Sequence, residues 1–402
     1  MSSFRAPRVI PYLGIVLGVV VSACTPPSSN VGSVEHPRSP SPPAPWKADE
    51  SRLSAGYDFT CGVRRDARVV CWGRNSKGQL GRGSSEENGH DGRVVDDVED
   101  VVAVAAGGEH ACALTREGRI ACWGADDASL DPSGGVRPLA AFVPRAFGNA
   151  RSITVGARHV CFTDDGNRPR CFGWGSDGQL GDGAATPRPS PMPVFGLDGV
   201  GSLSAGEAHT CATDLGGAIF CWGSGRDGRL GTGVTQTYAM VLTATRVGSA
   251  FSGSVVAGGR MTCAVERTGA VSCWGRHLPG RVLAEGDPAY VHATPSVVPG
   301  LERGALRVAV GHTHACAIRE RGDVVCWGWN ESGQLGDGTT EDSAVPREVA
   351  GLTERVVEVA AGRQHTCARS VSGAVSCWGR GAFGQLGPGR ESSRVPVPVT
   401  TL

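Results

Sequence analysis

The sequence predicts an all-β protein, a seven-bladed β-propeller with one disulfide in each blade. Fourteen of the fifteen cysteines form seven pairs, each ten positions apart, and the pairs recur every 49 to 53 residues. A glycine-containing hairpin accompanies most pairs, and a Gln-Leu-Gly segment follows several of them. A fixed period of about 50 residues indicates a repeat architecture, in which one unit is copied and packs against its neighbours.

Composition is compatible with this fold and argues against a nucleic-acid partner. The 402 residues include 60 glycines and 25 prolines, which is typical of short strands joined by tight turns. Basic and acidic residues number 39 each, so the formal net charge is zero. Phosphate binding requires a basic face, and we therefore expect no nucleic acid as partner.

Residues 1–23 are expected to form a lipoprotein signal peptide. Two arginines precede an apolar run over residues 9–21, which is short for a membrane span. The tetrad ending at Cys24 resembles the bacterial lipobox, and this resemblance implies that Cys24 is acylated, for example with palmitate. Thr25 follows in place of Asp, which by the usual sorting convention indicates the outer membrane of a two-membrane bacterium. The alternative is cleavage and secretion without lipid; both place the chain in an oxidising compartment.

Residues 24–50 are predicted to be a lipidated, extended tether. They are rich in proline and serine and lack apolar periodicity, so they cannot bury enough surface to fold. At about 3.1 Å per residue, the tether could hold a folded body up to ~70 Å from a bilayer. The propeller is then expected over residues 51–402.

The second copy, residues 101–124, illustrates one unit. An apolar strand, a glycine turn and two further strands are expected, the last two joined by a short hairpin loop. Six positions after the first cysteine, five copies have glycine and one has asparagine, which predicts left-handed backbone and a three-residue loop. The residues at this position are Ala67, Gly118, Asn167, Gly217, Gly269, Gly322 and Gly373.

This loop places the two cysteines of each copy directly opposite each other on antiparallel strands. Opposed residues lie about 4.5 to 5.5 Å apart between Cα atoms, within the range that a disulfide accepts. The predicted pairs are Cys61–Cys71, Cys112–Cys122, Cys161–Cys171, Cys211–Cys221, Cys263–Cys273, Cys316–Cys326 and Cys367–Cys377. Zinc sites use more closely spaced cysteines that converge on one ion, so we expect no metal.

The ends of the chain suggest how the ring closes. Both faces of the hairpin are apolar or small, as expected for blades stacked against one another. The first copy begins at residues 53–56 without a preceding Val-Pro segment, and the chain ends with such a segment, residues 394–400. We expect this last strand to pair with the first sheet and so remove exposed edges.

The motifs A-G-x-x-H-x-C-A, G-x-V-x-C-W-G and G-Q-L-G-x-G resemble the repeats of the regulator of chromosome condensation family, which forms seven-bladed propellers. All seven copies match in part, although paired cysteines replace the usual small residues on facing strands. Known functions in that family include a GTPase exchange factor that binds chromatin, a photoreceptor and an exported inhibitor of β-lactamases. The resemblance therefore implies the fold and leaves the function open.

Histidine recurs two positions before the first cysteine, and we interpret it as a packing residue. A ring of imidazoles could also hold a metal, but Phe59 and Met261, which are apolar and of similar bulk, replace histidine in two copies. The histidines are His110, His159, His209, His314 and His365. Asp182 and Asp337 lie in Gly-Asp-Gly turns without the further carboxylates of a calcium loop.

The pair of residues before the histidine position differs in every copy and should lie on one rim of the ring. Variable polar residues on a rigid scaffold are where binding is usually located. The predicted partner-binding residues are Tyr57, Asp58, Glu109, Arg158, Glu207, Arg260, His312 and Arg363. The long loops 84–93 and 275–292 are second candidates.

No catalytic motif is present, and the expected function is that of a non-enzymatic, monomeric scaffold without cofactor on the cell envelope. It is expected to recognise a protein or glycan at the cell surface through one propeller rim, anchored in the membrane by its lipid. The alternative is a glycan-active lyase or hydrolase with its site at the tunnel mouth. A third possibility is a purely structural envelope component.

Overall fold

The computed structural model describes residues 52–86, 92–126, 135–143, 148–233, 239–248, 253–276 and 291–400. The chain divides into two units, residues 1–46 and 47–402, and all that follows concerns the second. The expected signal peptide, Cys24 and the tether lie outside the described residues. Within those residues, no helix has the length and hydropathy needed to cross a membrane.

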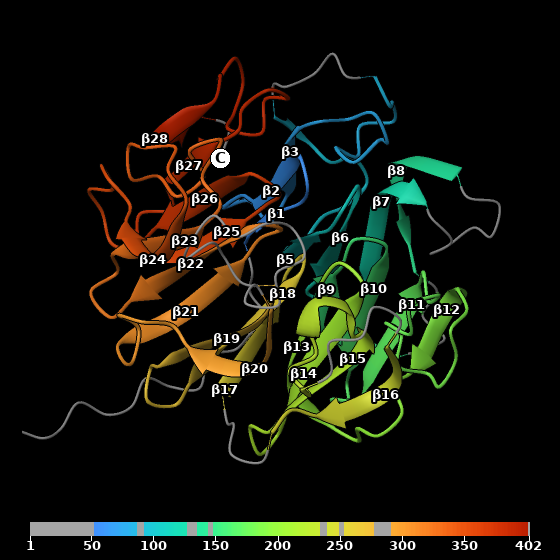
Figure 1. Cartoon of the computed structure of the whole chain (residues 1–402). Helices are drawn as coiled ribbons and strands as arrows, with labels where there is room; N and C mark the ends of the chain where they lie inside the picture. Colours follow the sequence, from blue (N-terminus) through green and yellow to red (C-terminus); the bar gives the residue numbers. More distant parts are fainter. Residues whose placement is uncertain are drawn as a thin grey trace, which may run out of the picture. The chain divides into compact units, whose positions relative to one another are not determined.

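The described strands form seven four-stranded antiparallel sheets, each made of consecutive strands (Figure 1). We number these sheets blades 1 to 7 in chain order. Blade 1 has β1 (Leu53–Ala55), β2 (Phe59–Val63), β3 (Val69–Gly73) and β4 (Arg93–Val94). Blade 2 has β5 (Val101–Ala106), β6 (His110–Thr115), β7 (Ile120–Asp126) and β8 (Gly135–Phe142). Blade 3 has β9 (Ala150–Val155), β10 (His159–Asp164), β11 (Pro169–Gly173) and β12 (Arg188–Pro193).

The remaining blades repeat this order, with a single 3-10 turn, η2 (Arg226–Gly228), among the described residues. Blade 4 has β13 (Val200–Ala205), β14 (His209–Asp214), β15 (Ile219–Ser224) and β16 (Met240–Arg246). Blade 5 has β17 (Gly253–Ala257), β18 (Met261–Glu266), β19 (Val271–Arg276) and β20 (Val291–Val297). Blade 6 has β21 (Ala305–Val310), β22 (His314–Arg319), β23 (Val324–Gly328) and β24 (Ser343–Glu348). Blade 7 has β25 (Val356–Ala361), β26 (His365–Ser370), β27 (Val375–Gly379) and β28 (Ser393–Val399).

The first strand of every blade contacts the first strands of both neighbouring blades, including β1 with β25, so these strands line the central axis. The fourth strands are the outer edges. Several of them carry proline, for example Pro191 in β12 and Pro396 in β28. Because proline lacks the N–H needed for a ladder, it protects an exposed edge against further pairing.

All seven predicted disulfides are present, and each joins the second and third strands of its own blade. The two cysteines of a pair are direct register partners, as Cys112 and Cys122 are between β6 and β7. Their Cα atoms lie 4.0 to 4.1 Å apart, somewhat closer than expected. The hairpin loops have the predicted left-handed residue, with φ of 76° at Gly118, and even Ala67 adopts a φ of 60°.

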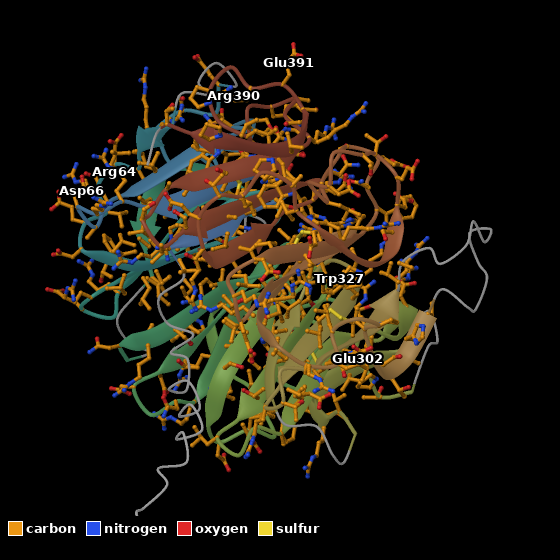
Figure 2. The ribbon with its side chains drawn as sticks, turned by 90° about the vertical axis from the view of Figure 1, so that its left-hand side faces the viewer. Arg64, Asp66, Glu302, Trp327, Arg390 and Glu391 are labelled. Atoms are coloured by element: carbon orange, nitrogen blue, oxygen red, sulfur yellow. A yellow bond between two sulfur atoms is a disulfide. The ribbon has the colours of Figure 1, made fainter. Side chains whose placement is uncertain are left out.

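The hydrophobic core lies between blades. Seven clusters of buried residues each combine side chains of two adjacent blades. The six tryptophans at the repeat position, such as Trp327 in Figure 2, are fully buried there. The indole Nε1 of Trp123 donates to the carbonyl of Gln79 in the preceding blade, and Trp222 bonds Gln179 in the same way. The Gln-Leu-Gly segment therefore binds the tryptophan of the next blade.

The prediction that the last strand pairs with the first sheet is wrong. β28 pairs with β27 of its own blade, and blade 1 has its own fourth strand, β4. The repeat unit ends with the Val-Pro segment instead of beginning with it. β4 gives little signal in the sequence because it has only two residues and no proline.

The ring instead closes by packing two complete blades, 7 and 1, against each other (Figure 1, red and blue). The carboxylate of Glu358 accepts hydrogen bonds from the backbone N–H groups of Arg52 and Leu53. The indole of Trp72 donates to the carbonyl of Gln385. The disulfides and side chains inside the sheets appear in Figure 2.

Candidate binding site at the tunnel mouth

A closed circle of backbone hydrogen bonds surrounds the axis at one end of the propeller. In each blade, the turn between the first and second strands donates an N–H to a carbonyl in the corresponding turn of the next blade. The seven bonds are Tyr57 to Gly107, Gly108 to Gly156, Ala157 to Gly206, Glu207 to Gly258, Gly259 to Gly311, His312 to Gly362 and Arg363 to Tyr57. The variable pairs predicted from the sequence therefore lie together on one rim.

The turns approach so closely that the glycines have no room for a side chain. A Cβ at Gly107 would lie 1.9 Å from the carbonyl oxygen of Gly156, and one at Gly56 would lie 2.5 Å from that of Gly107. The bonded turns thus form a rigid platform that fixes the backbone from which every variable side chain projects.

Below this platform, a second layer of contacts joins neighbouring blades. His159 Nε2 lies 2.9 Å from Thr210 Oγ1, and the equivalent pairs are His209–Thr262, His314–Thr366 and His365–Thr60. Because Thr210 donates its hydroxyl proton to the carbonyl of Gln179, its oxygen must accept from the histidine. Burial lowers the pKa of His159, His314 and His365 to about 3, so these imidazoles are neutral packing groups.

Three of the predicted binding residues converge across the axis. The rings of Tyr57 in blade 1 and His312 in blade 6 meet edge to face, with centroids 5.6 Å apart. His312 Nε2 lies 3.7 Å from a carboxylate oxygen of Glu207 in blade 4. Arg229, which replaces the glutamine of Gln-Leu-Gly in blade 4, lies 3.7 Å from the other oxygen. We call Tyr57, Glu207, Arg229 and His312 the mouth cluster.

The mouth cluster combines a charged pair with a neutral phenol. Burial raises the pKa of Tyr57, and the nearby Glu207 raises it further, so the phenol stays protonated. Burial also acts to raise the pKa of Glu207, but the contact with His312 and the charges of Arg229 and Arg260 outweigh it, and the net pKa is lowered. Burial lowers the pKa of Arg229, opposed by Glu207 and Asp227. Glu207 is therefore ionised at neutral pH.

The other predicted residues spread around the rim. Asp58 is buried and lies 3.6 Å from Arg74, whereas Arg158 and Arg363 are exposed. Glu109 and Arg260 are half-buried. The second candidates were the long loops 84–93 and 275–292. Residues 87–91 and 277–290 of these loops lie outside the described residues.

Sequence reasoning missed an outer ring of side chains on the same face. The residue after each Trp-Gly or Phe-Gly is arginine in three copies, tryptophan in two, and alanine or serine in the other two. Its N–H donates to a carbonyl in the first turn of its own blade, as Arg74 does to Asp58 and Arg380 to Gln364. Trp174 occupies this position in blade 3, where the guanidinium of Arg158 lies 4.0 Å above its ring. Variation directly after a repeated Trp-Gly was the available signal. The turns, this outer ring and the loops that follow it form what we call the mouth face.

The opposite face carries a cavity of about 620 Å³ at the seam of blades 1 and 2. None of the predicted binding residues lines it. Its lining is acidic for the most part: Arg68, Asp96, Asp97, Glu99, Asp100, Thr115, Glu117, Arg119 and Phe142. Among the described residues, no group of histidine, cysteine and carboxylate side chains is arranged to hold a metal ion.

Curated proteins with similar sequences include a plant receptor and a ligase. The chain is 31% identical over 253 residues to the ultraviolet-B receptor UVR8 of Arabidopsis thaliana. This match covers 62% of this chain and 46% of the receptor. It is 31% identical over 330 residues to the human E3 ubiquitin-protein ligase HERC2, covering 80% of this chain and 6% of the ligase. The matched region thus spans less than half of each of these relatives.

Solved structures share the fold. Prp20p of Saccharomyces cerevisiae superimposes with a TM-score of 0.73 at 19% identity, covering 88% of each chain. Human WBSCR16 superimposes with a TM-score of 0.69 at 24% identity, covering 80% of this chain and 88% of the other.

Two family profiles, both described as the regulator of chromosome condensation (RCC1) repeat, match the chain. One matches residues 66–114, 170–213 and 321–369, and the other matches residues 51–79, 101–128, 306–334 and 356–385. Together they cover about half of the sequence, and their positions agree with the blades. This protein therefore belongs to the regulator of chromosome condensation (RCC1) repeat family.

Proposed function

We propose that this protein is a non-enzymatic binding scaffold that recognises a protein or glycan partner through its mouth face. The observation that carries this proposal is the closed circle of hydrogen-bonded turns, which presents a different pair of side chains from each blade. A rigid platform with copy-specific polar residues loses little entropy on binding, which favours recognition.

Two further observations favour a protein partner over a glycan. The yeast relative Prp20p has been described for its binding to Gsp1p and histones, and Kap60 has been crystallised bound to it. In addition, the mouth face carries arginine and aromatic side chains, namely Tyr57, Arg158, Trp174, Arg363 and Phe383, and these residue types are enriched at protein interfaces.

We further propose that the protein is exported and anchored through lipid at Cys24 in the cell envelope, in the outer membrane of a two-membrane bacterium. Seven disulfides require an oxidising compartment, which supports export. Cells fed an alkyne analogue of palmitate should incorporate the label into the natural chain and lose it in Cys24→Ser. Label retained by Cys24→Ser would contradict the anchor.

An enzymatic alternative rests on the mouth cluster, where a phenol, an imidazole and a carboxylate meet. These groups serve as acids and bases in glycan-active enzymes. Turnover of a cell-wall or uronic-acid polysaccharide by the purified protein, abolished by Glu207→Gln and His312→Gln, would establish this alternative over the scaffold.

Site-specific crosslinking on intact cells tests the scaffold. A photoreactive amino acid replaces Arg158 or Arg260 on the mouth face and, as matched controls, Arg303 or Arg321 in exposed loops of the opposite face. We expect both mouth-face positions to crosslink the same partner, identified by mass spectrometry, and both controls to leave it unlabelled. Equal crosslinking from the two faces would refute a mouth-face site.

A further inference from the structure

We propose that the seam between blades 7 and 1 on the mouth face binds carboxylate side chains of an acidic segment in the partner protein. This inference rests on the proposed function and specifies the chemistry of the partner. The site consists of Tyr57 and Arg74 from blade 1 and Arg363, Arg380 and Phe383 from blade 7, which we call the seam patch.

Guanidinium groups and aromatic rings alternate in the seam patch. The guanidinium carbons of Arg74 and Arg380 lie 4.8 and 5.4 Å from the centroid of the Phe383 ring. The guanidinium carbon of Arg363 lies 5.8 Å from the centroid of Tyr57. Residues far apart in the chain thus meet only because the ring closes between these two blades.

Two of the three arginines in the seam patch have no carboxylate partner among the described residues. Across the described residues, neither Arg363 nor Arg380 forms an ion pair with a carboxylate; Arg380 donates to the side-chain oxygen of Gln364. Within the patch, Arg74 has a carboxylate nearby, that of Asp58 at 3.6 Å. Elsewhere on the same face, Arg229 is neutralised by Asp227 at 3.0 Å and approached by Glu207.

The chemistry of these groups selects a carboxylate ligand. A guanidinium offers a planar fork of N–H donors that matches a carboxylate in bidentate fashion, and stacking on a ring restricts its motion before binding. Because the rings of Tyr57 and Phe383 are already engaged by arginines, they are poorly placed to stack on a sugar. An acidic polypeptide therefore fits better than a glycan.

The test measures binding of a fluorescein-labelled hexaglutamate peptide to residues 51–402 with disulfides intact and to the full chain, by fluorescence anisotropy. We expect binding that weakens as salt is raised from about 50 to 200 mM. The double variant Arg363→Gln/Arg380→Gln should bind about 10-fold more weakly or worse, since each charged hydrogen bond contributes appreciably. The control Arg303→Gln/Arg321→Gln removes the same charge from the opposite face and should bind like the natural protein.

A second arm separates charge from geometry. Arg363→Lys/Arg380→Lys keeps the charge but loses the planar fork, and we expect it to bind more weakly than the natural protein. Circular dichroism on every variant verifies that folding is unchanged. Equal loss in the opposite-face control, or no hexaglutamate binding at all, would overturn the proposal.

A glycan arm uses polygalacturonate as probe. Arginine-dependent binding of polygalacturonate without binding of hexaglutamate would overturn the choice of a protein segment. Crosslinking through Arg158 in blade 3 does not depend on the seam patch. If that crosslink persists while hexaglutamate fails to bind, the carboxylate site is refuted and the mouth-face scaffold stands.

Discussion

At the scale of single residues, the histidine–threonine pairs connect each blade to the next. The sequence indicated that the histidine position is structural, but the threonine lies in the following copy and gives no signal within one repeat. The two positions vary together: Phe59 and Met261 are followed in the next blade by Ala111 and Ala315. Comparing the histidine position of each copy with the threonine position of the next copy would have revealed this contact. His110 is the exception, because the next copy has valine at the threonine position.

These histidines should make the fold sensitive to acid. The pKa of His159, His314 and His365 is about 3 in the folded protein and about 6.5 in the unfolded chain, so below pH 6.5 only the unfolded chain gains the proton. Each such histidine should therefore cost about 1.4 kcal/mol of unfolding free energy per pH unit as the pH falls from 6.5 toward 3. Urea denaturation at a series of pH values measures this slope.

A double variant provides the control for the pH effect. His365→Phe with Thr60→Ala copies the natural Phe59–Ala111 pair and should fold, with a slope smaller by the contribution of one histidine. Thr60→Ala alone leaves the imidazole of His365 without its acceptor and should destabilise by about 1 to 3 kcal/mol. A slope unaffected by the double variant would disprove the role of His365.

At the scale of the element, the hairpin was the most predictable part of the fold. Its register follows from one loop position, because a left-handed residue there fixes the cysteines opposite each other. The fourth strands were less predictable, since β4 has two residues and the edge depends on packing that the local sequence does not encode. Tyr57, Glu207 and His312 were predicted to lie on one rim, but their convergence into the mouth cluster could not be predicted, because they come from three separate blades.

We expect the disulfides to be unreactive toward thiol reagents in the folded protein and to contribute to its stability. The cysteines of blade 5, Cys263 and Cys273, are fully buried, as are nearly all the others in the pairs. Thiol titration of the folded residues 51–402 should detect no reactive group without denaturant. Cys263→Ala/Cys273→Ala should lower the free energy of unfolding by on the order of 3 kcal/mol, measured by urea denaturation. Rapid reaction of about fourteen thiols in the native protein would contradict the pairing.

At the scale of the whole propeller, the glycine turns around the axis control closure. Gly107→Ala places a methyl group against the backbone of Gly156, which cannot move without disturbing the circle of bonds. We expect a loss of about 1 to 3 kcal/mol in the free energy of unfolding. Gly199→Ala is the matched control, because its Cβ would lie 3.4 Å from Leu215, an ordinary contact. Comparable losses for both variants would exclude crowding at the axis as the cause.

Blades 7 and 1 meet as finished sheets, with no strand shared between the first and last copies. Each repeat therefore forms a complete sheet by itself. A tandem duplication of one repeat would add a complete blade and leave no incomplete sheet at either terminus. Proteolytic cleavage in a loop between two blades would likewise break no strand pairing. The two fragments could then reassemble through the blade faces that pack against each other.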